Sequence, residues 1–180
     1  MGAQGERVQH VGVLVPSFAQ TDREGQARIA AFLDTLRKLG WVEGRNLQIT
    51  YRFAAGEPGR RRAAAQELVR SVPDLIVVVA DSALADVQRL TSTIPVVFIQ
   101  VGDPIGSGHV ASLARPGGNI TGFSSNPPSM GGKWLGVLKE AAPNVVRAAV
   151  VFGSDSGNNP EFVRAAESGA GIAWGSNYPY

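Results

Sequence analysis

The chain has 180 residues, of which 44% are hydrophobic and 18% charged, and its formal net charge is +2. This composition is typical of a globular protein and excludes a disordered chain. The absence of cysteine excludes disulfides and thiolate metal sites, and so small a basic excess does not indicate nucleic acid as a partner.

Short apolar runs alternate with amphipathic stretches along the first two-thirds of the chain. The runs at 75–79 and 96–99 contain only apolar residues, as in strands buried on both faces of a parallel sheet. Asp22 is placed to cap the first helix, and Asp81 or Ser82 to cap the third. The predicted strands are 11–15, 47–53, 75–79, 96–99 and 119–123, and the helices between them are 22–38, 60–71 and 81–90.

This alternation predicts an α/β fold with a doubly wound, Rossmann-like parallel sheet of five strands in the flavodoxin-like order, flanked by helices. After it, a helix at 131–141, a strand at 148–152 and a helix at 160–168 predict the start of a second α/β unit. That unit would have only about 50 residues, fewer than a domain usually needs. We therefore expect a first lobe at 1–123, a hinge at 124–129 and an incomplete second lobe at 130–180.

Three motifs point beyond the fold class: FLDTLRKLGWVEGRN at 32–46, GDPIG at 102–106 and VASLARPGGNITG at 110–122. They resemble the ABC-transporter substrate-binding proteins of the type I periplasmic-binding fold, in the branch related to tryptophan- and tyrosine-type uptake proteins. The resemblance implies a small organic solute, such as an amino acid or related carboxylate, held between two lobes. It also implies an ABC permease as partner and a periplasmic or extracytoplasmic location.

The chain departs from this family at both ends. No signal peptide is visible in residues 1–9, and the tail 169–180 does not resemble the second lobe of family members. We therefore expect a truncated product with a complete first lobe and only the opening of the second. Such a chain would bind its ligand weakly or not at all, and its exposed lobe surface could pair into a homodimer.

The resemblance implies that the loops after strands one, three, four and five hold the ligand. Hydroxyls and amides there could bind a carboxylate, and an acidic group could bind an amine. Each residue also has a structural interpretation, as a helix cap, turn or hinge residue. The candidate ligand-binding residues are Ser17, Asp81, Ser82, Asp103, Ser124 and Ser125.

Two other classes of function remain open. An enzyme on a Rossmann-like sheet could use Asp81 or Asp103 as an acid or base, and any histidine-dependent chemistry would rest on His10 or His109. No G-x-G-x-x-G motif follows the first strand, which disfavours a dinucleotide, and no cofactor or metal is predicted. The effector domain of a transcriptional regulator shares the fold, but residues 1–8 leave no room for a helix-turn-helix.

Overall fold

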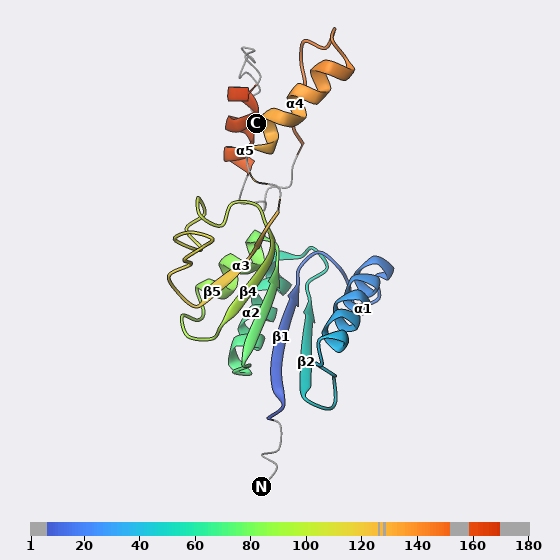
Figure 1. Ribbon diagram of the computed structural model, residues 1–180, viewed down its shortest axis with the longest axis vertical. Helices are drawn as coiled ribbons and strands as arrows, with labels where there is room; N and C mark the ends of the chain where they lie inside the picture. The colour runs from blue at the N-terminus through green and yellow to red at the C-terminus, as the bar shows by residue number, and fades with distance from the viewer. Residues whose placement is uncertain (1–6, 126, 128, 152–158, 170–180) are drawn as a thin grey trace.

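The structure, a computed structural model, describes residues 7–125, 127, 129–151 and 159–169. Its centre is a five-stranded sheet in the order β2-β1-β3-β4-β5, in which every neighbouring pair is parallel (Figure 1). This is the flavodoxin-like order, so the predicted doubly wound α/β fold is confirmed. The strands are β1 Gln9–Val15, β2 Leu47–Phe53, β3 Leu75–Val79, β4 Val96–Val101 and β5 Ile120–Ser124.

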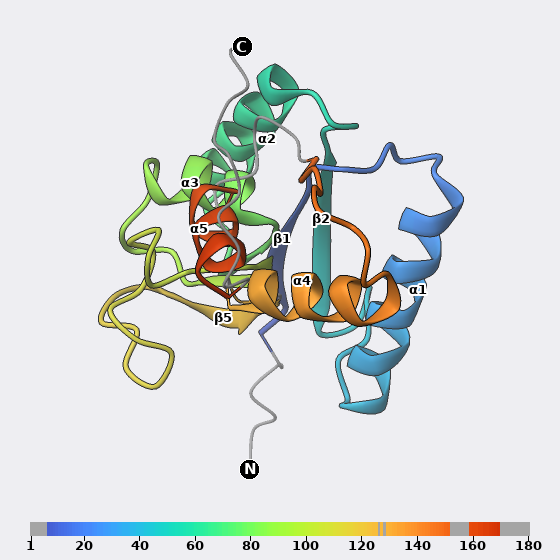
Figure 2. The ribbon, with the colours of Figure 1, turned by 90° about the horizontal axis from the view of Figure 1, so that it is seen from above.

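Helices cover the two faces of this sheet unequally. Figure 2 shows α1 on one side of the sheet and α2 with α3 on the other. Right-handed crossovers require this arrangement, because the chain steps from β1 to β2 in one direction and from β2 to β5 in the opposite one. Residues 102–119 connect β4 to β5 without a helix. The three helices are α1 Arg23–Lys38, α2 Pro58–Arg70 and α3 Asp81–Gln88.

The main core lies between the sheet and the pair α2 and α3. Leu14, Ile76 and Phe98 project from three neighbouring strands and are fully buried. Leu68 of α2 and Leu84 of α3 cover them and are also fully buried. The alternation of side chains along each strand sends their neighbours to the opposite face, where α1 lies.

The α1 face is only partly covered. Val13, Val15 and Val77 form a smaller cluster there, against which Phe32 of α1 packs. Farther from α1, Ile99 is only half-buried and Phe123 is 74% exposed. Among the described residues no element covers this part of the sheet, although a doubly wound sheet normally carries helices on both faces.

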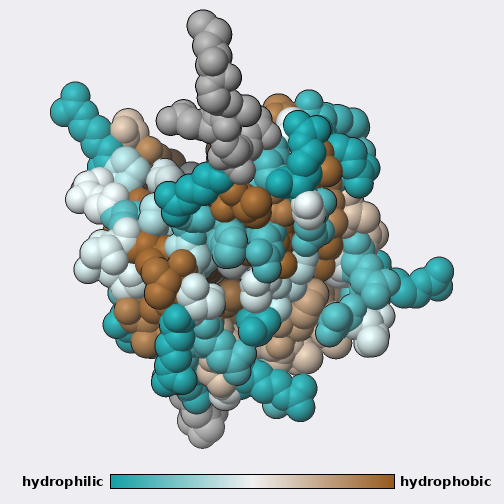
Figure 3. Space-filling view, turned by 90° about the horizontal axis from the view of Figure 1, so that it is seen from below, coloured by the Kyte–Doolittle hydropathy of each residue, from teal (hydrophilic) through white to brown (hydrophobic). Residues whose placement is uncertain are grey.

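The opposite, amino-terminal edge of the sheet is also partly apolar. Leu39, Val72 and Leu90 each follow the end of a helix and are 70%, 75% and 39% exposed. Seen from below in Figure 3, brown apolar areas are separated by teal hydrophilic side chains. Scattered single apolar residues of this kind are normal on a protein surface.

The C-terminal third forms two helices, α4 Met130–Ala141 and α5 Asn159–Gly169, beyond the carboxyl-terminal edge of the sheet (Figure 1). Trp134 packs against Phe162 with ring centroids 4.8 Å apart, and Gly131 lets the two helices approach closely. A strand was predicted at 148–152, and this prediction is wrong for residues 148–151, which form no strand. Residue 152 lies outside the described part. A strand needs a neighbour for its backbone groups, and no second sheet is present among the described residues.

Two further boundaries differ from expectation. Asp22 caps α1 as predicted, since its Oδ1 accepts from the Gly25 backbone N–H at 2.8 Å. Neither Asp81 nor Ser82 caps α3, because Ala80 occupies the cap position and the helix begins at Asp81. Strand β5 includes Ser124, which the sequence places in the hinge, and residues 126 and 128 lie outside the described part.

No described helix is long and apolar enough to span a bilayer.

Candidate functional site

The loops that follow β1, β3, β4 and β5 all leave the sheet at its carboxyl-terminal edge. Because the strands are parallel, this edge brings together residues that are far apart in the sequence. Ser17 lies in the first of these loops and Ser82 in the first turn of α3, and neither side chain has a hydrogen-bond partner among the described residues. Both hydroxyls are therefore available to a ligand at this edge.

Asp81 makes side-chain contacts to two residues of the connection between β4 and β5. Its Oδ1 lies 3.1 Å from Nε2 of His109, and its Oδ2 accepts from the Ser107 hydroxyl at 3.3 Å. The other ring nitrogen of His109, Nδ1, lies 2.5 Å from Oε1 of Gln88. The His109 side chain is only 4% exposed and that of Asp81 15%. Asp81 therefore ties the loop after β4 to the start of α3.

Asp103 adopts the turn geometry that its place before Pro104 predicts. Its Oδ1 accepts from the Gly106 backbone N–H at 2.9 Å, and its carbonyl accepts from the Ser107 N–H at 3.0 Å. The residue is half-buried. A carboxylate can accept several hydrogen bonds at once, so this turn positions Asp103 without excluding a ligand.

Ser124 and Ser125 join the ends of β4 and β5. The Ser124 hydroxyl donates to the carbonyl of Gly102 at 2.9 Å, and the Ser125 N–H donates to the carbonyl of Val101 at 2.9 Å. Both serines therefore extend the pairing of the two strands at the carboxyl edge. Ser125 presents a half-buried side chain at the point where the chain leaves the sheet.

Backbone strain occurs at the ends of both central strands. Ala80, after β3, has φ of 72° and ψ of 157°, and Gln100, near the end of β4, has φ of 58°. At Gln100 the ladder between β4 and β5 is irregular. Residues other than glycine rarely adopt such angles, and they gather at binding and catalytic sites. Ala80 and Gln100 both lie at the edge where the candidate residues meet.

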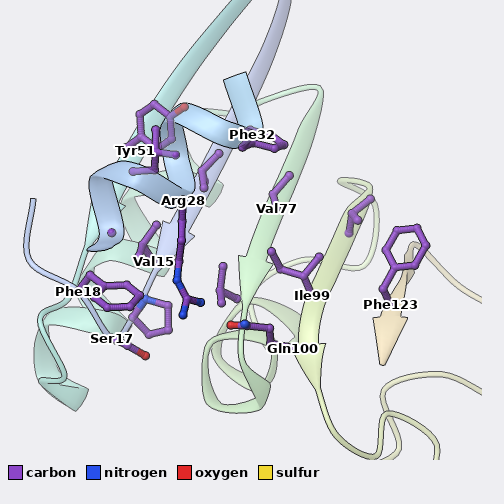
Figure 4. Close-up of a pocket in the computed structure, with 16 residues that line it drawn as sticks. Val15, Ser17, Phe18, Arg28, Phe32, Tyr51, Val77, Ile99, Gln100 and Phe123 are labelled. Atoms are coloured by element: carbon purple, nitrogen blue, oxygen red, sulfur yellow. The ribbon is translucent and has the colours of Figure 1, made fainter. Parts of the chain in front are cut away.

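A cavity of about 440 Å³ opens beside this edge, between α1 and the bare part of the sheet, and we call it the α1 cavity. Figure 4 shows that its walls come from β1, β3, β4 and α1, with Phe123 on the far side. Ser17 is the one candidate residue that lines it. The cavity thus runs down the sheet face and reaches the carboxyl edge at Ser17.

Sequence analysis did not single out two polar residues of this cavity, Arg28 and Gln100. Arg28 is on the second turn of α1, where an arginine usually faces solvent, and its guanidinium lies over the Phe18 ring at 5.2 Å. Gln100 is the next-to-last residue of β4, at the register shift between β4 and β5, and it lines the cavity. Phe18, which follows Ser17, could either stack on a ligand or cover the core, and it lines the cavity half-buried.

No cluster of three or more metal-ligating side chains occurs in the part of the chain that the structure describes. Among the described residues, a clear pKa shift occurs only at Tyr51, where burial first and the negative charge of Glu43 second raise the pKa of the phenol to about 12. Tyr51 lines the α1 cavity. Its hydroxyl oxygen is buried and has no hydrogen-bond partner among the described residues.

Comparison with known proteins identifies the family of this chain. Residues 19–170 match the family described as ABC transporter substrate binding protein. This match spans most of the chain, so the chain belongs to that family, as the motifs predicted. A curated relative, the tyrosine-binding protein of Clostridioides difficile, is 27% identical over 128 residues, which are 71% of this chain and 36% of the relative.

Solved structures show the same fold. A conserved domain protein from Vibrio cholerae is 30% identical with a TM-score of 0.79, and the match covers 92% of this chain and 55% of that one. A protein of Streptococcus pneumoniae in complex with L-Trp has a TM-score of 0.79 at 24% identity, over 91% of this chain and 54% of the other. The chain thus spans about half, or less, of the length of the proteins it matches.

Proposed function

We propose that this chain acts as the first lobe of the solute-binding component of an ABC uptake system. Its ligand would be a small organic solute, an amino acid or a related carboxylate. The observation that carries the proposal is the convergence of Ser17, Ser82, Asp103 and Ser125 on the carboxyl-terminal edge of one parallel sheet. Membership in the substrate-binding family and the similarity to a tyrosine-binding protein support the choice of ligand.

Each residue has a task in this proposal. The free hydroxyls of Ser17 and Ser82 and the amides of the first turn of α3 would bind the ligand carboxylate. Asp103 would bind an ammonium group. Asp81 would act indirectly, because its bonds to His109 and Ser107 hold the loop that carries Asp103.

Transport requires two further steps. Closure of a second lobe about the hinge at 124–129 would bury the ligand, and a membrane permease would recognise the closed form. Such a protein works in the periplasm or outside the cytoplasmic membrane. No covalent chemistry is required, because binding and closure perform the whole task.

The alternative is an enzyme that uses Asp81 or Asp103 as an acid or base on a Rossmann-like sheet. Such chemistry would be helped by a histidine facing the edge. His109 is instead buried, and both of its ring nitrogens are directed at side chains of α3. This arrangement supports the binding function over the enzyme.

A thermal-shift screen tests the proposal, with L-tyrosine, L-tryptophan, small carboxylates and NAD as probes. A ligand that binds only the folded chain at ten times its Kd adds about 1.4 kcal/mol of stability, so the midpoint rises with concentration. We expect an amino acid or a carboxylate to raise the midpoint. One lobe supplies only part of the contacts, so millimolar concentrations would be needed.

Asp103→Asn is the informative variant, since the amide oxygen can still accept from Gly106 while the negative charge is lost. It should weaken binding of an amino acid at least tenfold. Asp34→Asn, on the outer part of α1, is the matched control and should bind as the wild type does. No shift with any solute would refute ligand binding by this chain, and a shift with NAD alone would favour the enzyme.

A further inference from the structure

His109 is a buried histidine in the connection between β4 and β5. Its side chain is only 4% exposed. Its Nε2 lies 3.1 Å from Asp81 Oδ1, and its Nδ1 lies 2.5 Å from Gln88 Oε1. Burial of a polar ring is costly unless its nitrogens have partners, and both nitrogens of His109 have one. The ring is therefore held in one defined position against α3.

Helix α3 gives His109 a rigid support. Asp81 is the first residue of the helix and Gln88 the last, so the imidazole contacts the helix at both ends. Between these ends, Leu84 and Val87 are fully buried in the main core. Side chains packed at the density of a protein interior resist displacement. The two contacts of His109 therefore fix where the connection lies along α3.

The backbone of His109 is bonded to the residue next to Asp103. The N–H groups of His109 and Val110 donate to the Pro104 carbonyl at 2.9 and 3.1 Å. Pro104 is itself buried, and the Asp103 carbonyl accepts from the Ser107 N–H at 3.0 Å. A shift of the imidazole would therefore move the turn that carries the Asp103 carboxylate.

The position of this turn matters because an α-amino acid carries its two charged groups on one carbon atom. In the proposed function, Ser82 and the amides of α3 bind the carboxylate, and Asp103 binds the ammonium group. One ligand can occupy both subsites only if the distance between them is held. We propose that His109 is a positioning residue that fixes this distance and thereby selects α-amino acids over carboxylates that lack the ammonium group. The inference rests on the proposed function and narrows its ligand class.

Two ligands that differ only in the ammonium group, L-phenylalanine and 3-phenylpropionate, test the proposal. Titration of the whole chain followed by NMR chemical shifts measures dissociation constants in the millimolar range. We expect the wild type to bind L-phenylalanine at least tenfold more tightly than 3-phenylpropionate. His109→Leu places an apolar side chain in the buried position and removes both ring contacts. It should reduce the preference to less than threefold and change the Kd of 3-phenylpropionate by less than twofold, because the carboxylate subsite on α3 is left intact.

A second variant keeps the test decisive if His109→Leu folds poorly. Gln88 is half-buried in the last turn of α3, so Gln88→Ala removes one ring contact and leaves the main core in place. It should reduce the preference by about threefold. Val69→Ala, which removes part of a side chain packed on the main core from α2, is the matched control. It should lower the unfolding midpoint and leave the preference unchanged.

The outcomes separate this inference from the proposed function. If the wild type binds neither ligand, or both equally, the choice of an α-amino acid as ligand is refuted and the inference fails with it. A tenfold preference that persists in both His109→Leu and Gln88→Ala would overturn the positioning role and leave the proposed function standing. Equal weakening of both ligands in these variants would also overturn the positioning role, because a purely structural residue would give that result.

Discussion

Asp81, His109 and Tyr51 show how burial changes what a polar side chain can do. Asp81 has both oxygens in contact with His109 and Ser107, and it therefore ties the loop after β4 to the start of α3. Tyr51 has a buried hydroxyl with no described partner, so its polar atom lowers the stability of the fold. Contacts of single atoms thus distinguish a polar group with partners from one without.

Tyr51→Phe tests the second of these assignments. Burial raises the pKa of the phenol to about 12 from its ordinary value of 10.0. Because the pKa of the phenol is higher in the folded state, its contribution to folding stability is fully present below pH 10. That contribution is lost as the pH rises toward 12. The variant should lose less stability over that interval, and at pH 7 it should be as stable as the wild type or more so.

Urea denaturation at pH 7, 10 and 11.5, with circular dichroism as the readout, measures both effects. Equal losses of stability in the two proteins at alkaline pH would contradict burial of the hydroxyl. A variant that is less stable by more than about 1 kcal/mol at pH 7 would show that the hydroxyl has a partner.

At the scale of elements, the pairing of β4 with β5 depends on one glycine. A Cβ on Gly122 would lie 2.1 Å from the carbonyl oxygen of Phe98, which is too close for any side chain. Phe98 is fully buried in the main core and cannot move aside freely. This close approach places β5, and with it Ser124 and Ser125, beside the loop that carries Asp103.

Gly122→Ala should therefore destabilise the fold by about 2 kcal/mol or more, because either the strand pairing or the core must shift. Gly59→Ala is the matched control, since a Cβ there meets nothing within 4 Å in the first turn of α2. It should be neutral or stabilising by up to about 1 kcal/mol. Denaturant midpoints of the two variants compare them, and equal midpoints would show that β5 is not packed as described.

At the scale of the whole molecule, α4 carries several exposed apolar side chains. Trp134, Val137 and Leu138 are 51%, 63% and 38% exposed, and α4 packs mainly on α5. Exposed apolar patches of this kind mark surfaces that associate. We propose that α4 is the lobe surface through which two copies pair.

Sedimentation velocity over a hundredfold range of concentration tests this pairing. The wild type should shift toward the dimer as concentration rises, and Val137→Lys should remain monomeric because it places a charge in the patch. Val72→Lys, at a residue 75% exposed on the opposite edge, is the control and should associate like the wild type. A monomer at every concentration would refute the pairing.

The sequence predicted most of the fold because the signals for it are local. Leu47–Phe53 and Leu75–Val79 were predicted at their observed bounds, since a strand buried on one or both faces shows its pattern directly in its own residues. The prediction of a strand at 148–152 was wrong because strand formation there depends on distant residues. An apolar run becomes a strand only beside a partner, and its own residues do not reveal whether one is present.

The sequence predicted only part of the candidate site. That ligand-binding loops follow parallel strands could be predicted, because sheet topology determines where strand ends meet. That Asp81 faces His109, 28 residues later, and that Arg28 and Gln100 border one cavity could not. These contacts join distant segments, and no periodicity or motif encodes them.

By itself, then, the sequence determined the strand order, the family and the edge at which ligand loops gather. It could do so because hydrophobic periodicity and long motifs are properties of residues that are neighbours in the chain. Only the tertiary structure decided which polar groups are engaged and which are free, and that one face of the sheet is left open beside α1. The physical reason is that burial and hydrogen bonding are set by the packing of distant elements, and the free energy of a polar side chain depends on those neighbours.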